Sequence, residues 1–192
     1  GIDICALTNT QDERYEYVLD KIKTKTIRQN QLEIYNNCII AKGEKIIFRG
    51  EELQTDKGDL ILIGANKTIW KPKTPLSLRE AVNIGKGEGL FILAPHPYSG
   101  HGGIGDYLQD ICEDIDAIEL NPNCSVVVTG LLDKREDNSK AEKFAKEKGI
   151  PLIWTSDAHW ADETGRGYFK INGEIEFLNG EDALQKIKEN VK

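Results

Sequence analysis

Short apolar runs recur along the chain, and in its second half they alternate with stretches of helical periodicity. The runs are bounded by Gly, Pro, Asn or Asp, a pattern that is typical of buried strands. It predicts strands at 2–8, 38–41, 45–48, 59–65, 90–94, 116–120 and 151–155. Strands that alternate with helices favour a largely parallel sheet or barrel.

Apolar residues at helical spacing predict helices between and after these strands. The expected ranges are 13–23, 76–86, 138–148 and 182–191, with a further helical or loop-helix stretch at 104–112. Ser77 is the expected N-cap of the second helix. The Asn172-Gly173 pair predicts the turn of a hairpin formed by 168–171 and 174–178.

Composition fits one soluble domain, because 192 residues with 39% hydrophobic and 30% charged residues can bury a sizeable core. The net charge of −7 disfavours nucleic acid as a partner, although a local basic groove or a bound metal could still hold it. No apolar run approaches the roughly 20 residues of a membrane span. The four cysteines form no C-x-x-C pair, which indicates reduced thiols and a cytoplasmic protein.

The beginning of the chain is unusual. It starts at Gly1, enters a strand pattern at once, and has no methionine anywhere. We therefore expect either that the chain is a fragment of a longer polypeptide or that residues are missing from it.

His, Asp and Glu side chains follow the predicted strands closely, and all three histidines of the chain do so. In parallel α/β architectures, functional groups gather at the carboxyl ends of strands. The candidate residues are Glu52, His96, His101, Asp157 and His159. Imidazole and carboxylate groups together can hold a divalent metal such as zinc, manganese or iron, so we interpret the clustering as a metal site.

Asp157 and His159 lie two positions apart after the apolar run of 152–154. If the strand continues through them, both side chains point into one cleft. The alternative is an Asp-His hydrogen bond that only orders a loop. His96 stands between two prolines, whose stiff backbone suits a ligand held in position, or a histidine bonded to a loop carbonyl.

Three further residues have weaker patterns. His101 lies among glycines, where a mobile loop could bring it to a substrate phosphate, or it is an exposed residue without a role. Arg166 between Gly165 and Gly167 could hold an anion, although a surface turn is the default interpretation. Glu119 lies in an alternating strand and is expected to be a buried partner and not a ligand.

Taken in order, these motifs resemble those of the PHP family (polymerase and histidinol phosphatase), in particular its stand-alone metal-dependent phosphoesterases. The residues that carry the resemblance are Gly1–Thr8 (second strand), Arg49–Glu52 (Gly-x-Glu), Ala94–Tyr98 (His-Pro), Ile118–Asn121, Thr155–His159 and Gly165–Gly167 (closing motifs). The resemblance implies an α/β fold, an irregular (β/α)7, TIM-like barrel. It also implies divalent metals at the C-terminal rim of the strands and hydrolysis of phosphate esters.

The chain departs from the family at two places. The opening His-x-His strand has no counterpart, and Asn9-Thr10 stand where the second strand normally ends in Asp-His. The resemblance therefore implies one PHP-like domain over 1–192 that lacks the first strand and its motif. Its remaining metal ligands are Glu52, His96, Asp157 and His159, enough for one metal with open positions.

Two hypotheses for function follow. The first is metal-dependent hydrolysis of a small phosphomonoester, a nucleotide or a nucleic-acid end, with His101 and Arg166 stabilising charge on the phosphate. The acidic net charge slightly favours the small substrates. The second is a catalytically degenerate PHP-like module that binds a ligand or serves an assembly, as the lost Asp-His pair suggests. A serine hydrolase is disfavoured, because the chain has no G-x-S-x-G motif.

Overall fold

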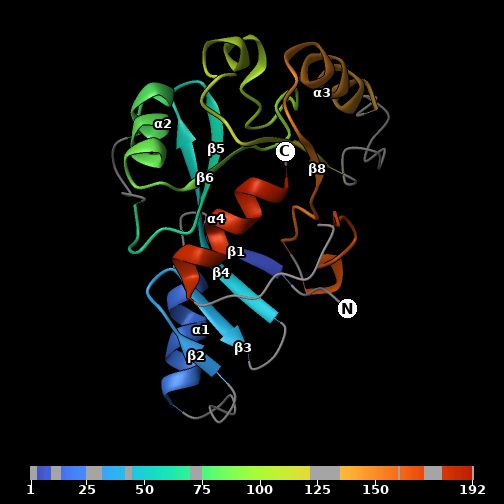
Figure 1. Ribbon diagram of the computed structural model, residues 1–192. Helices are drawn as coiled ribbons and strands as arrows, with labels where there is room; N and C mark the ends of the chain where they lie inside the picture. The colour runs from blue at the N-terminus through green and yellow to red at the C-terminus, as the bar shows by residue number, and fades with distance from the viewer. Residues whose placement is uncertain are drawn as a thin grey trace.

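The computed structural model describes residues 4–9, 14–24, 32–41, 45–69, 75–121, 135–159, 161–170 and 179–191. In these residues eight strands form one mixed sheet with helices packed against it (Figure 1). The strands are β1 Ile4–Asn9, β2 Leu32–Ile34, β3 Cys38–Ala41, β4 Lys45–Thr55, β5 Gly58–Ile63, β6 Phe91–Ala94, β7 Ala117–Leu120 and β8 Leu152–Trp154. The helices are α1 Arg14–Lys23, α2 Leu78–Gly87, α3 Arg135–Lys148 and α4 Gly180–Asn190, with 3-10 helices η1 Gly105–Asp110 and η3 Ala161–Glu163.

β4 is the strand around which the first half of the sheet is built. β1 pairs with it in parallel along one edge. On the other edge, β3 pairs antiparallel with its first half and β5 antiparallel with its second half. The change of partner falls at Arg49, whose N–H donates to Asn37 and whose carbonyl accepts from Gly64, each at 2.8 Å. β4 is therefore longer than the predicted 45–48.

The prediction of a largely parallel sheet holds only in part. β6, β7 and β8 are parallel, as are β1 and β4, but β2 to β6 pair antiparallel in succession. Parallel neighbours need a crossover of a dozen or more residues, whereas only Asp56 and Lys57 separate β4 from β5. Within the described residues the paired strands run along an open path from β2 to β8, so a closed barrel is not seen there.

The two faces of the sheet are covered by different helices. α4 packs against β3 and β4 through Ala183, Leu184 and Ile187. α1 packs on the opposite face through Tyr15 and Ile22. These helices cover opposite faces because neighbouring residues of a strand point to opposite sides.

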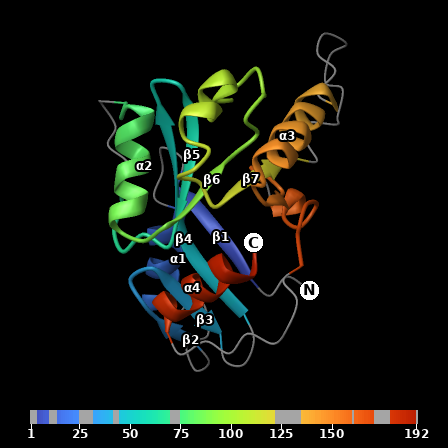
Figure 2. The ribbon, with the colours of Figure 1, turned by 45° about the horizontal axis from the view of Figure 1, so that its top comes forward.

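Beyond β4, α2 and α3 cover β5, β6 and β7 (Figure 2). Most of their buried positions are small, with Ala81 and Val82 beside Leu78 on α2, and Ala141 and Ala145 on α3. The opposite face of β5, β6 and β7 belongs to the apolar cluster that contains the buried residues of α4, and this cluster extends to Ile153 of β8. One face of the sheet is thus shared between these strands and α4.

Local signals in the sequence set most helix limits. Ser77 caps α2 as predicted, and a reciprocal capping box joins it to Glu80. α4 begins at Gly180, two residues before the predicted start, because Asn179 accepts hydrogen bonds from the N–H groups of Glu181 and Asp182. The predicted 104–112 stretch contains η1.

Some predictions fall wholly or partly elsewhere. Tyr168 to Lys170 has no regular secondary structure, and the rest of the predicted hairpin, 171–178, lies outside the described residues. The three-residue strand β2 was not predicted. Of the cysteines, Cys5, Cys38 and Cys112 are free thiols, and Cys124 is not among the described residues. None of the helices in the described part of the chain has the length and apolar character that a membrane crossing requires.

Candidate metal centre

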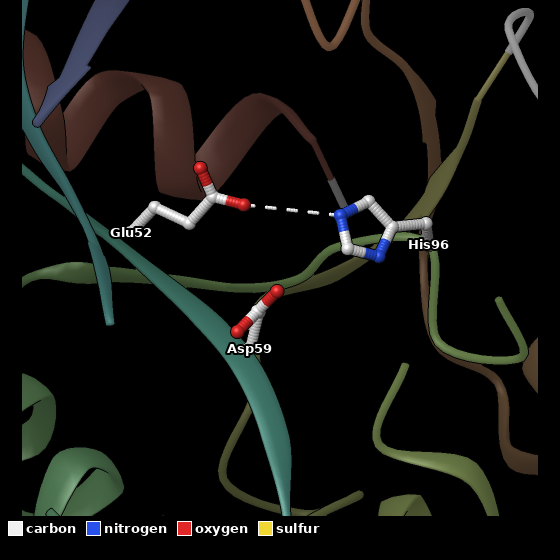
Figure 3. A group of neighbouring side chains, drawn as sticks. All are labelled: Glu52, Asp59 and His96. Atoms are coloured by element: carbon white, nitrogen blue, oxygen red, sulfur yellow. Dashed lines mark ion pairs between the residues drawn. The ribbon is translucent and has the colours of Figure 1, made fainter. Parts of the chain in front are cut away.

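Three side chains with metal-ligating atoms meet at one end of the sheet, on the face shared with α4. They are Glu52 of β4, Asp59 of β5 and His96 just after β6, and one ligand atom from each lies within 4.8 Å of the others (Figure 3). His96 Nε2 lies 3.8 Å from Glu52 Oε1. Two of these residues, Glu52 and His96, are among the predicted ligands.

The strand directions explain why the three residues converge. β5 runs antiparallel to both β4 and β6, so it begins at the end of the sheet where those two strands finish. In the β4–β5 register Glu52 is opposite Ile61, which places Asp59 diagonally across on the same face. His96 follows two residues after the end of β6.

The backbone of His96 is in an unusual conformation. Its φ is +26°, and Asp157 has a φ of +44°; these are the non-glycine residues with positive φ in the described part of the chain. Positive φ is disfavoured for side chains with a Cβ atom and is concentrated at functional sites. The His96 N–H donates to Glu119 Oε2 at 2.7 Å. Its Nδ1 is buried without a hydrogen-bond partner among the described residues.

The charges at this end of the sheet favour a cation. Burial alone would lower the pKa of His96, but a hydrogen bond to Glu52 and the charges of Glu119 and Asp157 raise that pKa to about 9. Burial raises the pKa of Asp59 to about 6, and the charges of Glu52 and Asp157 act in the same direction. The cluster of Glu52, Asp59 and His96 therefore has two carboxylates and one imidazole, and this excess of acidic groups favours a bound cation.

The donor set fits a divalent metal. Two carboxylates and one imidazole are ligands that zinc, manganese and iron accept. The buried, unpartnered Nδ1 of His96 also fits, because a buried polar atom without a partner is uncommon and is a sign of a missing partner.

Asp157 and His159 lie at the same end but in different surroundings. Asp157 Oδ2 accepts from Asn121 Nδ2 at 2.7 Å, and the negative charge of Asp157 raises the pKa of both Asp59 and His96. The His159 side chain is 62% exposed, with Nδ1 3.9 Å from Asp157 Oδ1. The expected strand alternation does not apply, because β8 ends at Trp154 and Asp157 has positive φ.

The residues predicted to contact phosphate are exposed. His101 donates its N–H to Ser99 Oγ at 3.2 Å and precedes Gly102 in the loop that packs against Asp59. Arg166 forms ion pairs with Asp162 and Glu163 of its own turn. Glu163 in turn accepts the N–H of His159 at 2.9 Å. Glu119 is buried, as predicted.

Comparisons with known proteins support the resemblance seen in the motifs. Residues 135–191 match the family model described as PHP-associated. The lesion-specific endonuclease PfuEndoQ from Pyrococcus furiosus is a structural match, with a TM-score of 0.57 and 15% identity over 98% of this chain and 48% of that one. The chain is thus similar to PHP-associated proteins over residues 135–191 and to this endonuclease in its fold.

Two more solved structures match. Endonuclease Q, in a complex with a 27-mer duplex that has an abasic lesion at the active site, gives a TM-score of 0.58 and 14% identity over 100% of this chain and 48% of that one. A two-domain protein from Bacteroides vulgatus, described as containing a predicted PHP-like metal-dependent phosphoesterase, gives 0.49 and 16% identity over 83% and 44%. The chain spans about half the length of these structures. A comparison with curated proteins gives no match.

Asp59 was not among the predicted ligands. It falls in a predicted strand, but the alternation of strands and helices favoured a largely parallel sheet. The signal was available, because Asp56-Lys57-Gly58 is a short turn sequence between two apolar runs, and it indicates a hairpin. An antiparallel pairing of those runs places Asp59 next to Glu52.

Asn9, which stands where the motif resemblance would place an acidic residue, is hydrogen-bonded inside the fold. It is 1% exposed and donates to Glu16 Oε2 and Glu51 Oε1, at 3.1 and 2.9 Å. Its own Oδ1 accepts the N–H of Tyr15, at the start of α1, at 3.0 Å. Because Glu51 and Glu52 are adjacent in a strand, this network and the Glu52 carboxylate lie on opposite faces of β4.

Replacing Asn9 with Ala should therefore destabilise the protein without weakening metal binding. Loss of these buried hydrogen bonds is expected to lower the free energy of unfolding by about 2 kcal/mol. Urea unfolding and calorimetric titration with Mn²⁺ would measure the two effects. Asn190→Ala, at an exposed position on α4, is the control and should change stability by less than about 0.5 kcal/mol. A drop in Mn²⁺ affinity in Asn9→Ala would contradict the assignment of opposite faces.

Proposed function

We propose that this chain hydrolyses phosphate esters with a divalent metal held by Glu52, Asp59 and His96, and with Asp157 and His159 beside them. The observation that carries the proposal is the convergence of the first three residues from β4, from β5 and from the segment just after β6. Zinc, manganese and iron all suit these ligands. A divalent metal in this position would polarise a phosphoryl oxygen and lower the pKa of a bound water.

The residues around the metal ligands would orient the substrate. Asp157 is held by its hydrogen bond from Asn121. His101 lies in the loop Gly100–Gly103, called the glycine loop below, whose Gly102 carbonyl accepts the Asp59 N–H. We propose that the exposed His101 side chain contacts the substrate phosphate. We propose the same role for Arg166, whose guanidinium is held by Asp162 and Glu163 and is half-exposed. Both cations would stabilise negative charge as it develops on the phosphoryl group.

The proposed substrate is a small phosphomonoester, a nucleotide or a nucleic-acid end. The net charge of −7 favours the smaller molecules. The structural likeness to Endonuclease Q, which was solved with a DNA duplex, makes a nucleic-acid substrate worth testing beside them. We propose that residues 1–192 form a single PHP-like domain whose open sheet corresponds to part of an irregular (β/α)7 barrel, and that the protein is cytoplasmic.

A second candidate function is a degenerate PHP module that binds a ligand or a partner without hydrolysis. The observation in its favour is Asn9, which accepts the N–H of Tyr15 in the first turn of α1 and hydrogen-bonds two glutamates where the family has an acidic residue. The two functions differ in turnover. A degenerate module would bind metal or substrate and release no phosphate.

Asp59→Asn tests the proposed function most directly. Losing a ligand should weaken metal binding by about 100-fold or more, because removing a group that only orients a ligand already costs about 10–100-fold. Affinity would be measured by calorimetry with Mn²⁺ and Zn²⁺. Hydrolysis would be followed on a nitrophenyl phosphate, a nucleotide and an end-labelled DNA strand, before and after chelation.

Asp110→Asn is the matched control, because Asp110 is an exposed carboxylate on η1. It should leave both metal affinity and turnover unchanged. Wild-type protein that binds neither metal would refute the proposed centre. Metal binding without turnover on any of the three substrates would favour the degenerate module.

A further inference from the structure

We propose that Glu119 is a positioning residue for this site. Its buried carboxylate holds the backbone of His96 on one side and Thr155, which leads to Asp157, on the other. The inference rests on the proposed metal centre and adds a residue that controls its geometry without ligating the metal.

The position of β7 in the sheet makes this role possible. β7 lies between β6 and β8 and pairs with both in parallel. His96 follows β6 and Thr155 follows β8, so Glu119 near the end of β7 stands between them. Its Oε2 accepts the His96 N–H at 2.7 Å, and its Oε1 accepts the Thr155 hydroxyl. One carboxylate therefore joins the two segments that flank the site.

Stability alone does not account for a carboxylate at this position. Glu119 is 1% exposed, and burial raises its pKa. Removing a carboxylate from water is costly, and an apolar side chain of similar size would often be at least as stabilising. A hydrogen bond from a backbone N–H to an ionised carboxylate is, however, stronger than one between neutral groups. Such a bond is suited to holding His96 at its disfavoured φ of +26°.

The residue that follows this strand contacts the second residue with positive φ, Asp157. Asn121 lies two positions after Glu119 and donates to Asp157 Oδ2 at 2.7 Å. Its backbone is held by Asn138, which donates to its carbonyl at 3.1 Å and accepts from its N–H at 3.3 Å. His96 and Asp157 are thus each hydrogen-bonded to a side chain from the end of β7. We infer that Glu119 and Asn121, at the end of β7, fix the positions of the two residues with positive φ.

Amide exchange in protein labelled with ¹⁵N-histidine tests the positioning without any metal. Three histidine amides are expected, and a His96 variant identifies one of them. In Glu119→Ala the His96 amide should exchange about tenfold faster or more, the change that one hydrogen bond is worth. The amides of His101 and His159, which donate to Ser99 and Glu163, should be unaffected and serve as internal references.

Metal titration provides the second readout. Glu119→Ala should raise the Mn²⁺ dissociation constant by about 10–100-fold, as loss of a group that orients a ligand does elsewhere. Glu119→Gln should recover part of both the amide protection and the affinity, because its carbonyl can still accept from His96 and its NH₂ can donate to Thr155, but the bond to His96 is then between neutral groups and weaker. Glu51→Ala is the control, since Glu51 is 0% exposed and faces away from the site. It should leave the His96 amide unchanged.

The outcomes separate the two proposals. A folded Glu119→Ala protein with a protected His96 amide, or with wild-type affinity for Mn²⁺, overturns the positioning role. If that variant does not fold, Glu119→Asp, which keeps the charge but is too short to reach both donors, takes its place under the same criteria. Wild-type protein that binds no metal contradicts the proposed function instead, and the exchange experiment still decides the role of Glu119.

Discussion

The free energy of unfolding should be about 1 kcal/mol higher for His96→Gly than for His96→Ala, while both variants lose metal binding. Each substitution removes the imidazole and therefore one ligand of the proposed centre. They differ by a single methyl group at a backbone φ of +26°, which glycine adopts without strain. Urea unfolding of the metal-free variants would measure the difference, and titration with Mn²⁺ would measure the loss of binding.

The sign of this difference is what identifies strain. At an ordinary φ, alanine is the more stabilising residue, because glycine loses more conformational freedom on folding. The pair Ser99→Gly and Ser99→Ala, in the same loop and outside the set of positive-φ residues, should therefore show alanine as the more stable. If His96→Ala also proves the more stable of its pair, the backbone at His96 is not strained.

Gly102→Ala is expected to weaken metal binding by about 10–100-fold. The substitution leaves Asp59 in the sequence but pushes its carboxylate out of place. A Cβ atom on Gly102 would overlap with Asp59 Oδ2 and lie 3.2 Å from His96 Cε1. The Gly102 carbonyl also accepts the Asp59 N–H at 2.6 Å, so the loop has little freedom to move away. Calorimetric titration with Mn²⁺ would measure the effect.

Gly105→Ala separates this contact from backbone strain. Gly105 has a φ of +60°, close to the +72° of Gly102, but a Cβ atom there would meet nothing within 4 Å. Both variants should lose about 1 kcal/mol of stability from the positive φ. Only Gly102→Ala should also lose metal affinity. Equal affinities in the two variants would show that the glycine loop does not constrain Asp59.

Local signals in the sequence were sufficient for most of the secondary structure. Ser77 and Glu80 specify where α2 begins, and the apolar runs mark seven of the strands near their observed positions. Strand direction could not be obtained in this way, because an apolar run has the same appearance whether its neighbour is parallel or antiparallel. The short Asp56–Gly58 turn was the one local indication of direction between β4 and β5.

Residues of the site also differ in whether the local sequence could predict them. Glu52 and His96 were predicted from motifs and strand ends, and the structure brings them together. Asp59 depends on the pairing register of two strands, which is a property of the sheet and not of the local sequence. The contacts of Glu119 join β6, β7 and β8 and are likewise visible only in three dimensions.

The partners of β4 also imply an order of events during folding. β3 and β5 are its immediate neighbours along the chain, so their hairpins close short loops at low entropic cost. β1 pairs across a separation of 42 residues at Asn9 and Glu51, and such contacts form slowly. The antiparallel β2–β5 unit is therefore suited to nucleate the domain. β1 would dock after this unit, onto an edge that is already formed, and bring with it Asn9, whose Oδ1 accepts the N–H of Tyr15 in the first turn of α1.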